Sequence, residues 1–116
     1  MLDPDCIFCK IVAKQVPTQL VYQDENVTAF RDMDPQAPVH VLLVPNQHVA
    51  NTEALEAEHD AAVGRLVRTA RTVARQEGVA ESGYRLVFNT GRDAHNSVPH
   101  LHVHLLGGRD LRWPPG

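Results

Sequence analysis

The stretch SVPHLHVHLLGGR, residues 97–109, places three of the chain's seven histidines at every second position. Side chains of a β-strand point alternately to the two faces of a sheet, so the spacing predicts that His100, His102 and His104 share one face. The residues between them are apolar and are expected to face the core. A neutral imidazole can serve as a nucleophile, a proton donor or acceptor, or a metal ligand. Three in register therefore indicate a chemical site, either for attack on a phosphoryl centre or for a metal ion.

Working outward from this segment, the chain carries five strand patterns and one long helix pattern. The predicted strands cover residues 20–23, 27–33, 39–44, 84–90 and 100–107. Apolar residues spaced i, i+3, i+4 predict a helix over residues 53–77, ended by Gly78, and a short helical piece is expected over residues 7–13. The order of these elements predicts an α+β fold, in which a five-stranded, mostly antiparallel sheet carries one long helix and a short N-terminal helix.

Length and charge narrow the possible partners. A chain of 116 residues fits one domain, residues 1–116, and its net charge of −3 gives no general attraction for a nucleic acid. No apolar run approaches the ~20 residues needed to cross a bilayer, so no membrane partner is expected. The N-terminus does not resemble a signal peptide, which predicts a cytoplasmic protein with reduced cysteines. A small phosphorylated molecule is the favoured ligand.

Cys6 and Cys9 form a Cys-x-x-Cys pair and are the only cysteines of the chain. Such a pair serves either redox chemistry or metal binding. The βαβ pattern expected around a thioredoxin-like redox motif is absent from the sequence. A tetrahedral metal site would require two further ligands from elsewhere in the chain.

The segment HLHVHLL resembles the His-x-His-x-His-x-x signature of the histidine triad (HIT) superfamily. The segments CIFCKI, FRDMDPQAPVHVLLVPNQHV, GYRLVFNTG and the terminal WPPG extend this resemblance, to the nucleotide-binding branch, over nearly the whole chain. Members of that branch are homodimeric hydrolases that cleave purine nucleoside 5′-monophosphoramidates without a catalytic metal. The resemblance therefore implies a HIT fold, this reaction, and a nucleoside monophosphate as ligand.

The resemblance also assigns roles to the polar residues. It makes His102 the nucleophile, and it places His104 on the phosphate and near the leaving group. His40 would support the orientation of the nucleophile through a hydrogen bond. Ser97 would help to protonate the leaving amine.

Further residues would bind the nucleotide. Asp32 corresponds to the acid that accepts hydrogen bonds from the ribose hydroxyls, and Asn89 to a contact on the phosphate side. The backbone N–H groups around Ser97 and Val98 are expected to donate to a phosphate oxygen. Four residues would wall the base pocket, with ordinary core burial as the alternative: Phe8, Ile11, Phe30 and Met33.

One loop departs from the pattern of the family. Residues 94–97 read Ala-His-Asn-Ser where relatives often carry Gly-Gly-Gln-Ser. Asn96 is shorter than the glutamine, and His95 is expected to be a solvated loop residue. Loop shape and leaving-group preference are therefore expected to differ from those of the relatives.

For the cysteines, the resemblance implies a structural Zn²⁺ held by Cys6, Cys9, His48 and His100. The alternative is that the cysteines pack as reduced thiols. The resemblance further implies that residues 109–116 form a tail that carries Trp113 toward the active site of a partner in a homodimer.

Other functions stay open beside the phosphoramidate hydrolase. The chain could hydrolyse diadenosine polyphosphates, or act as a purine-nucleotide sensor or scaffold with incidental hydrolysis. A nucleotidyltransferase is disfavoured because His104 stands where that branch has glutamine. A purely zinc-structural protein would leave Asp32 and Ser97 without a role.

Overall fold

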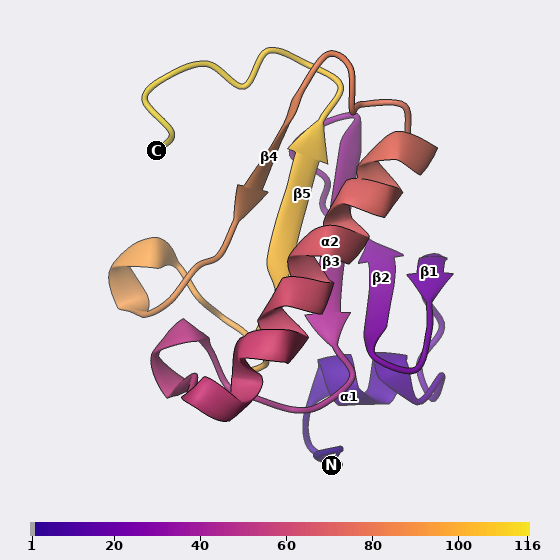
Figure 1. Ribbon diagram of the computed structural model, residues 1–116, viewed down its shortest axis with the longest axis vertical. Coiled ribbons are helices and arrows are strands. Elements are labelled where there is room, and N and C mark those ends of the chain that lie inside the picture. Colours follow the sequence, from indigo (N-terminus) through magenta and orange to yellow (C-terminus); the bar gives the residue numbers. More distant parts are fainter. Residues whose placement is uncertain (1) are drawn as a thin grey trace.

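The computed structural model describes residues 2–116, and its centre is a five-stranded sheet in the order β1-β2-β3-β5-β4 (Figure 1). Every neighbouring pair of these strands is antiparallel. The strands are β1 (Leu20–Gln23), β2 (Val27–Arg31), β3 (Val39–Pro45), β4 (Tyr84–Val87) and β5 (Val103–Gly107). The predicted α+β fold is confirmed.

Two hydrophobic clusters cover the two faces of the sheet. Val41 and Leu43 of β3 pack in the cluster that includes α2 (Asp60–Gln76), which crosses the front of the sheet in Figure 1. The intervening Leu42 and Val44 pack in the cluster of α1 (Ile7–Val12). This alternation is the period of a strand buried on both sides, and it separates the α2 face of the sheet from the α1 face.

The long helix begins later than its apolar spacing predicted. Residues 53–59 form two single 3₁₀ turns, η1 (Thr52–Ala54) and η2 (Ala57–His59), and α2 starts only at Asp60. Between the turns Leu55 and Glu56 are extended, with ψ of 138° and 171°, which interrupts any continuous helix. The predicted end is confirmed, since Gly78 adopts φ +75° directly after the helix.

The histidine strand is also shorter than predicted, because β5 pairs with β3 only from Val103 onward. Before that point the N–H of Leu101 bonds to the carbonyl of Val49 at 2.6 Å, outside the sheet ladder. The strand β4 ends at Val87, opposite His104, and is therefore also shorter than the predicted strand of residues 84–90. Leu101 nevertheless belongs to the α2 cluster, so the predicted alternation of faces holds through the irregular residues.

The strand β2 also ends earlier than the predicted residue 33. β2 ends at Arg31 because its pairing with β3 stops at Val41, and residues 32–38 form the loop between these strands.

Within residues 2–116, no helix combines the length and apolar character needed to cross a bilayer.

Candidate functional site

His102 lies on the α1 face of the sheet, one residue before β5. Its Nδ1 is 2.7 Å from the backbone carbonyl oxygen of His100. A carbonyl oxygen only accepts, so Nδ1 must carry the proton and donate it. In the neutral ring the lone pair is then on Nε2, the atom that a nucleophilic histidine uses. The ring of Phe8 packs edge-on against His102, with 5.1 Å between centroids, and restricts its rotation.

His40 and His104 form a second histidine unit. The backbone N–H of Gln36 donates to Nδ1 of His40 at 3.0 Å, which leaves the His40 proton on Nε2. Nε2 lies 2.9 Å from Nδ1 of His104 and donates to it. The predicted hydrogen bond from His40 to the nucleophile is therefore wrong for this chain: His40 bonds to His104, while the His100 carbonyl orients His102. The reason is the register, which places His104 opposite Leu42 and so diagonal to His40 on the same face.

Both rings of this unit are neutral at pH 7. Burial lowers the pKa of His104 to about 4, and the nearby His102 and His40 rings add to this effect. Burial also lowers the pKa of His40, against the opposing influence of the carboxylates of Asp32 and Asp34. A neutral His104 whose Nδ1 accepts a hydrogen bond carries its own proton on Nε2. It can therefore donate that proton to a bound group.

Asp32 joins this unit to an open hollow. Its Oδ2 lies 3.4 Å from Nε2 of His40, and its Oδ1 accepts from the N–H of Asp34 at 2.8 Å. Asp32 and Met33 line a hollow of about 530 Å³. The side chains of Asp32, His40 and His104 are close enough to surround an ion. However, His40 presents an N–H at this point, and an N–H cannot ligate a metal, so the geometry favours a hydrogen-bonded cluster.

The four predicted base-pocket residues divide into two groups. Phe8, Ile11 and Phe30 are buried in the α1 cluster, with exposed fractions of 7%, 7% and 3%. Their burial agrees with the core alternative, and Phe8 also contacts the His102 ring, so contact of these three side chains with a ligand stays a prediction. Met33 is 97% exposed and belongs to no core. Only Met33 is thus free to cover a ligand in the hollow beside Asp32.

The structure brings Cys6, Cys9, His48 and His100 together as predicted. The sulfur of Cys6 lies 3.3 Å from Nδ1 of His100, and the sulfur of Cys9 lies 3.3 Å from Nδ1 of His48. The two Nδ1 atoms are 3.2 Å apart. The edges of a tetrahedral zinc site are about 3.4 Å between two nitrogens and about 3.6 Å between nitrogen and sulfur. The four donor atoms therefore fit a tetrahedral metal ion.

His100 is prepared for this role by its surroundings. Its Nε2 donates to the carbonyl of Pro45 at 2.9 Å, which leaves the Nδ1 lone pair facing the cysteines. The ring is fully buried, and burial lowers its pKa to about 4. The ring is therefore neutral at pH 7, as metal binding requires. Burial raises the pKa of the Cys9 thiol, so without a metal this cysteine is protonated.

The altered loop lies between β4 and the histidine segment. Asn89 is half-buried just after β4, and the loop then forms the turn η3 (Arg92–Ala94). His95 follows in a left-handed conformation with φ 58° and is exposed, as expected of a loop residue. Ser97 is exposed and, together with Val98, lines a hollow of about 450 Å³ beside the Cys/His cluster. The expected roles of Asn89, Ser97 and Val98 toward a nucleotide stay predictions.

The C-terminal tail runs along the β4 edge of the sheet. Arg85 of β4 holds it by donating to the carbonyls of Leu111 and Arg112 at 3.3 and 2.6 Å. Trp113 is 80% exposed and borders a hollow of about 760 Å³ at this edge. An exposed tryptophan of this size is a candidate for contact with another molecule.

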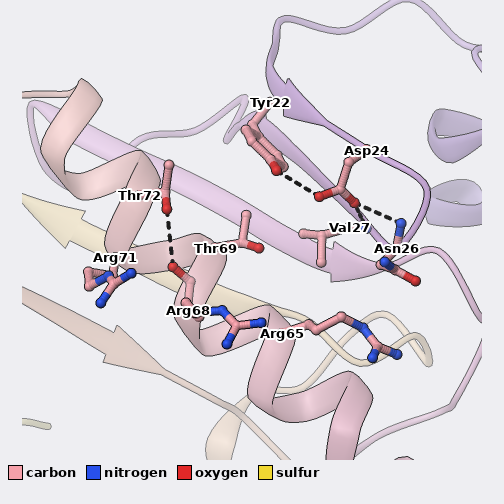
Figure 2. Close-up of a pocket in the computed structure, with 9 residues that line it drawn as sticks. All are labelled: Tyr22, Asp24, Asn26, Val27, Arg65, Arg68, Thr69, Arg71 and Thr72. Atoms are coloured by element: carbon pink, nitrogen blue, oxygen red, sulfur yellow. Dashed lines mark hydrogen bonds between the residues drawn. The ribbon is translucent and has the colours of Figure 1, made fainter.

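A further hollow, of about 350 Å³, lies between α2 and the β1–β2 turn (Figure 2). It contains no residue of the predicted site. Burial opposes ionisation of Asp24 in its wall, but hydrogen bonds from the Tyr22 hydroxyl and the N–H groups of Asn26 and Val27 lower the pKa of this carboxyl. These bonds, of 2.6 to 2.8 Å, hold the turn together. Asp24 therefore has a structural role.

Three contributions to the site were missed from the sequence, and all come from the backbone. The N–H of Gln36 fixes the tautomer of His40, the carbonyl of Pro45 fixes that of His100, and the carbonyl of His100 fixes that of His102. Pro35 and Pro38 lie on either side of Gln36 and Ala37, but nothing in the sequence of this loop indicated a bond to a histidine.

Comparisons with known proteins agree with this geometry. The sequence model of the HIT domain matches residues 13–111. The purine nucleoside phosphoramidase of Escherichia coli (strain K12) is 50% identical over 107 residues, covering 92% of this chain and 90% of that protein. A 14 kDa zinc-binding protein of Brassica juncea is 50% identical over 114 residues, covering 97% of this chain and all of that protein. The crystal structure of a HIT family hydrolase from Legionella pneumophila Philadelphia 1 superposes with a TM-score of 0.94 at 42% identity, over 97% of this chain and all of that one. The protein described here belongs to the HIT domain family and is a HIT-family hydrolase.

Proposed function

We propose that the chain hydrolyses the P–N bond of purine nucleoside 5′-monophosphoramidates through a nucleotidyl-histidine intermediate. The observation that carries this proposal is the 2.7 Å hydrogen bond from Nδ1 of His102 to the His100 carbonyl, which leaves Nε2 as the nucleophile. A relative named purine nucleoside phosphoramidase supports the choice of substrate.

In the first step, Nε2 of His102 attacks the α-phosphorus. A new P–N bond forms to the ring, and the P–N bond to the substrate amine breaks. The electron pair of that bond leaves with the amine, which requires a proton to depart as a neutral molecule. The Nε2–H of His104 and the hydroxyl of Ser97 are the proposed donors on the phosphate and leaving-group side.

In the second step, water attacks the phosphorus of the nucleotidyl-histidine. The hydroxyl of the water stays on the phosphorus, and its other proton returns to the group, Nε2 of His104 or the Ser97 hydroxyl, that protonated the amine in the first step. The P–N bond to His102 breaks, the ring recovers its lone pair, and a nucleoside monophosphate is released. In both steps the carbonyl oxygen of His100 accepts a hydrogen bond from the Nδ1–H of His102, which stabilises the transient positive charge on the ring. Asp32 would accept hydrogen bonds from the ribose hydroxyls, and Asn89 and the N–H of Val98 would contact the phosphate.

We also infer that Cys6, Cys9, His48 and His100 hold a structural Zn²⁺. Four protein ligands leave no open position, so the ion would tie α1 to the segment before β5 and take no part in the reaction. The name of the Brassica juncea relative supports zinc as the metal. Metal analysis of untagged protein should find one zinc per chain, and protein without stoichiometric zinc would contradict this assignment.

For the whole chain we propose a single HIT domain over residues 1–116 that forms an isologous homodimer. The exposed Trp113 in the tail, residues 109–116, supports this arrangement, in which the tail reaches toward the partner's active site. Light scattering at micromolar concentration should give the mass of two chains. The mass of one chain would contradict the proposal.

The reaction is tested with a fluorogenic adenosine phosphoramidate. The His102→Ala variant should lose at least about a thousandfold in kcat, as expected when a covalent nucleophile is removed. His95→Asn is the matched control, since His95 is exposed and asparagine tolerates its left-handed backbone. Nucleotide binding without turnover in the unaltered protein would overturn the enzyme proposal in favour of a nucleotide sensor.

A further inference from the structure

Arg109 connects the segment after β5 to the loop of residues 32–38. Its Nε and Nη2 both donate to the backbone carbonyl of Gln36, at 3.1 and 2.9 Å. Beside this contact, Gly108 adopts φ +89° and approaches Pro38 so closely that an added Cβ would lie 3.0 Å from its ring. The absence of a side chain at Gly108 thus allows the backbone to lie close to the loop of residues 32–38. The guanidinium of Arg109 then holds this loop through its two hydrogen bonds to the Gln36 carbonyl, called the two-pronged bond below.

The loop residue held by Arg109 is the one that fixes His40. The N–H of Gln36 donates to Nδ1 of His40, and the side-chain amide of Gln36 donates to the carbonyl of Asp34. Because Arg109 holds the carbonyl of Gln36, the backbone N–H of the same residue is kept pointing at the His40 ring. His40 itself is 6% exposed, so no water can readily replace this donor.

The Gln36 N–H, which donates to Nδ1 of His40, sets the direction of the hydrogen bonds between His40 and His104, and the Asp32 carboxylate, 3.4 Å from Nε2 of His40, favours the same tautomer. With Nδ1 of His40 accepting, its Nε2 must donate to Nδ1 of His104, and His104 must then carry its proton on Nε2. If the Gln36 N–H moved away, His40 could place its proton on Nδ1. Its Nε2 would then accept from Nδ1 of His104, and Nε2 of His104 would no longer be a donor.

We propose that Arg109 is a positioning residue of the active site, which, by anchoring Gln36, sets the tautomers of His40 and His104 and keeps the Nε2–H of His104 available. The catalytic consequence of this anchor rests on the proposed function, in which that N–H donates to the phosphate or the leaving group. The tautomers themselves do not depend on it.

The direct test measures the tautomers by histidine-ring ¹H–¹⁵N NMR on the full-length protein with its metal bound. In the unaltered protein, His40 and His104 should both carry the proton on Nε2. In Arg109→Gln, which cannot make the two-pronged bond, a share of His104 should carry it on Nδ1. Arg109→Lys, which can still donate to the Gln36 carbonyl, should restore the original tautomer. Arg68→Gln is the control, because Arg68 is an exposed arginine on α2 (Figure 2), the helix that packs on the face of the sheet opposite α1.

Hydrolysis of the adenosine phosphoramidate gives the second readout. Arg109→Gln should lower kcat about tenfold, the effect of one lost hydrogen bond, with little change in KM. Arg109→Lys should recover most of the rate, and Arg68→Gln should match the unaltered protein. Identical tautomers in Arg109→Gln and the unaltered protein would overturn the inference, as would an unchanged kcat. An unaltered protein that lacks hydrolysis, but whose His104 tautomer responds to Arg109→Gln, would contradict the proposed function and leave the anchor in place.

Discussion

Replacement of Phe8 tests whether this side chain is core, a wall of the ligand site, or both. Phe8 is 7% exposed, and its ring packs edge-on against three rings, with centroid distances of 5.4 Å to Phe30, 6.0 Å to His100 and 5.1 Å to His102. Truncation to alanine should lower the free energy of unfolding by about 3–5 kcal/mol, as for other buried phenylalanines. Phe8→Leu keeps most of the volume but loses the aromatic edges, which are worth about 0.5–1.5 kcal/mol each. With three such contacts the cost of Phe8→Leu should therefore be at least about 1.5 kcal/mol, the lower end of this range summed over the three rings.

Urea unfolding of the zinc-loaded protein measures both values. Ile7→Ala is the matched control, because Ile7 lies next to Phe8 on α1 but is 43% exposed, and its loss should cost less than about 1 kcal/mol. The kinetics provide a second measure. Phe8→Leu should lower kcat by about threefold to tenfold, because the His102 ring gains rotational freedom that must be lost again during attack. A cost below about 1 kcal/mol for Phe8→Ala, combined with a raised KM, would refute the assignment of Phe8 to the core.

Three further predictions concern the other parts of the site. Cys9→Ala should lose zinc and unfold at a lower temperature, and chelation of the metal from the unaltered protein should lower its Tm by a similar amount. Calorimetry measures both changes. An unchanged Tm after verified metal loss would contradict the structural role of the ion. Folded His104, with its pKa lowered from 6.5 to about 4, binds fewer protons than the unfolded chain between these values. The free energy of unfolding should thus fall by up to about 3 kcal/mol as the pH drops from 6.5 to 4, and His104→Asn should show a shallower slope. Asp32→Asn should raise KM about tenfold for ribonucleoside substrates but much less for 2′-deoxy analogues. Equal increases for both would contradict its contact with the ribose.

The sequence predicted the site best where a single periodicity governs the structure. The alternation of residues 100–105 correctly separated the histidines from the core leucines and valine, although residues 100–102 lie outside the regular strand. The face of the sheet toward which a side chain points is determined by the direction in which successive side chains leave an extended backbone. This alternation therefore continues where the hydrogen bonds between strands are absent. The Cys/His cluster was predicted as well, through the resemblance that linked Cys6 and Cys9 to two distant histidines.

The sequence failed where backbone groups decide between alternatives. The start of α2 depended on the extended backbone at Leu55 and Glu56, inside a stretch whose composition suits a helix. The partner of His40 depended on strand register, which side-chain type does not reveal. The anchor between Arg109 and Gln36 joins residues 73 positions apart through a carbonyl, a group that every residue possesses. No motif could therefore have indicated it.

In the proposed reaction, Nε2 of His102 becomes covalently attached to the nucleotide. The most direct test is rapid acid-free quenching of the enzyme during turnover of the adenosine phosphoramidate, followed by mass spectrometry of the peptide containing residues 97–109. We expect an adenylyl group on His102 in the unaltered protein and none in His102→Ala. Turnover with an adenylyl group on another histidine, or undiminished turnover in His102→Ala, would contradict it.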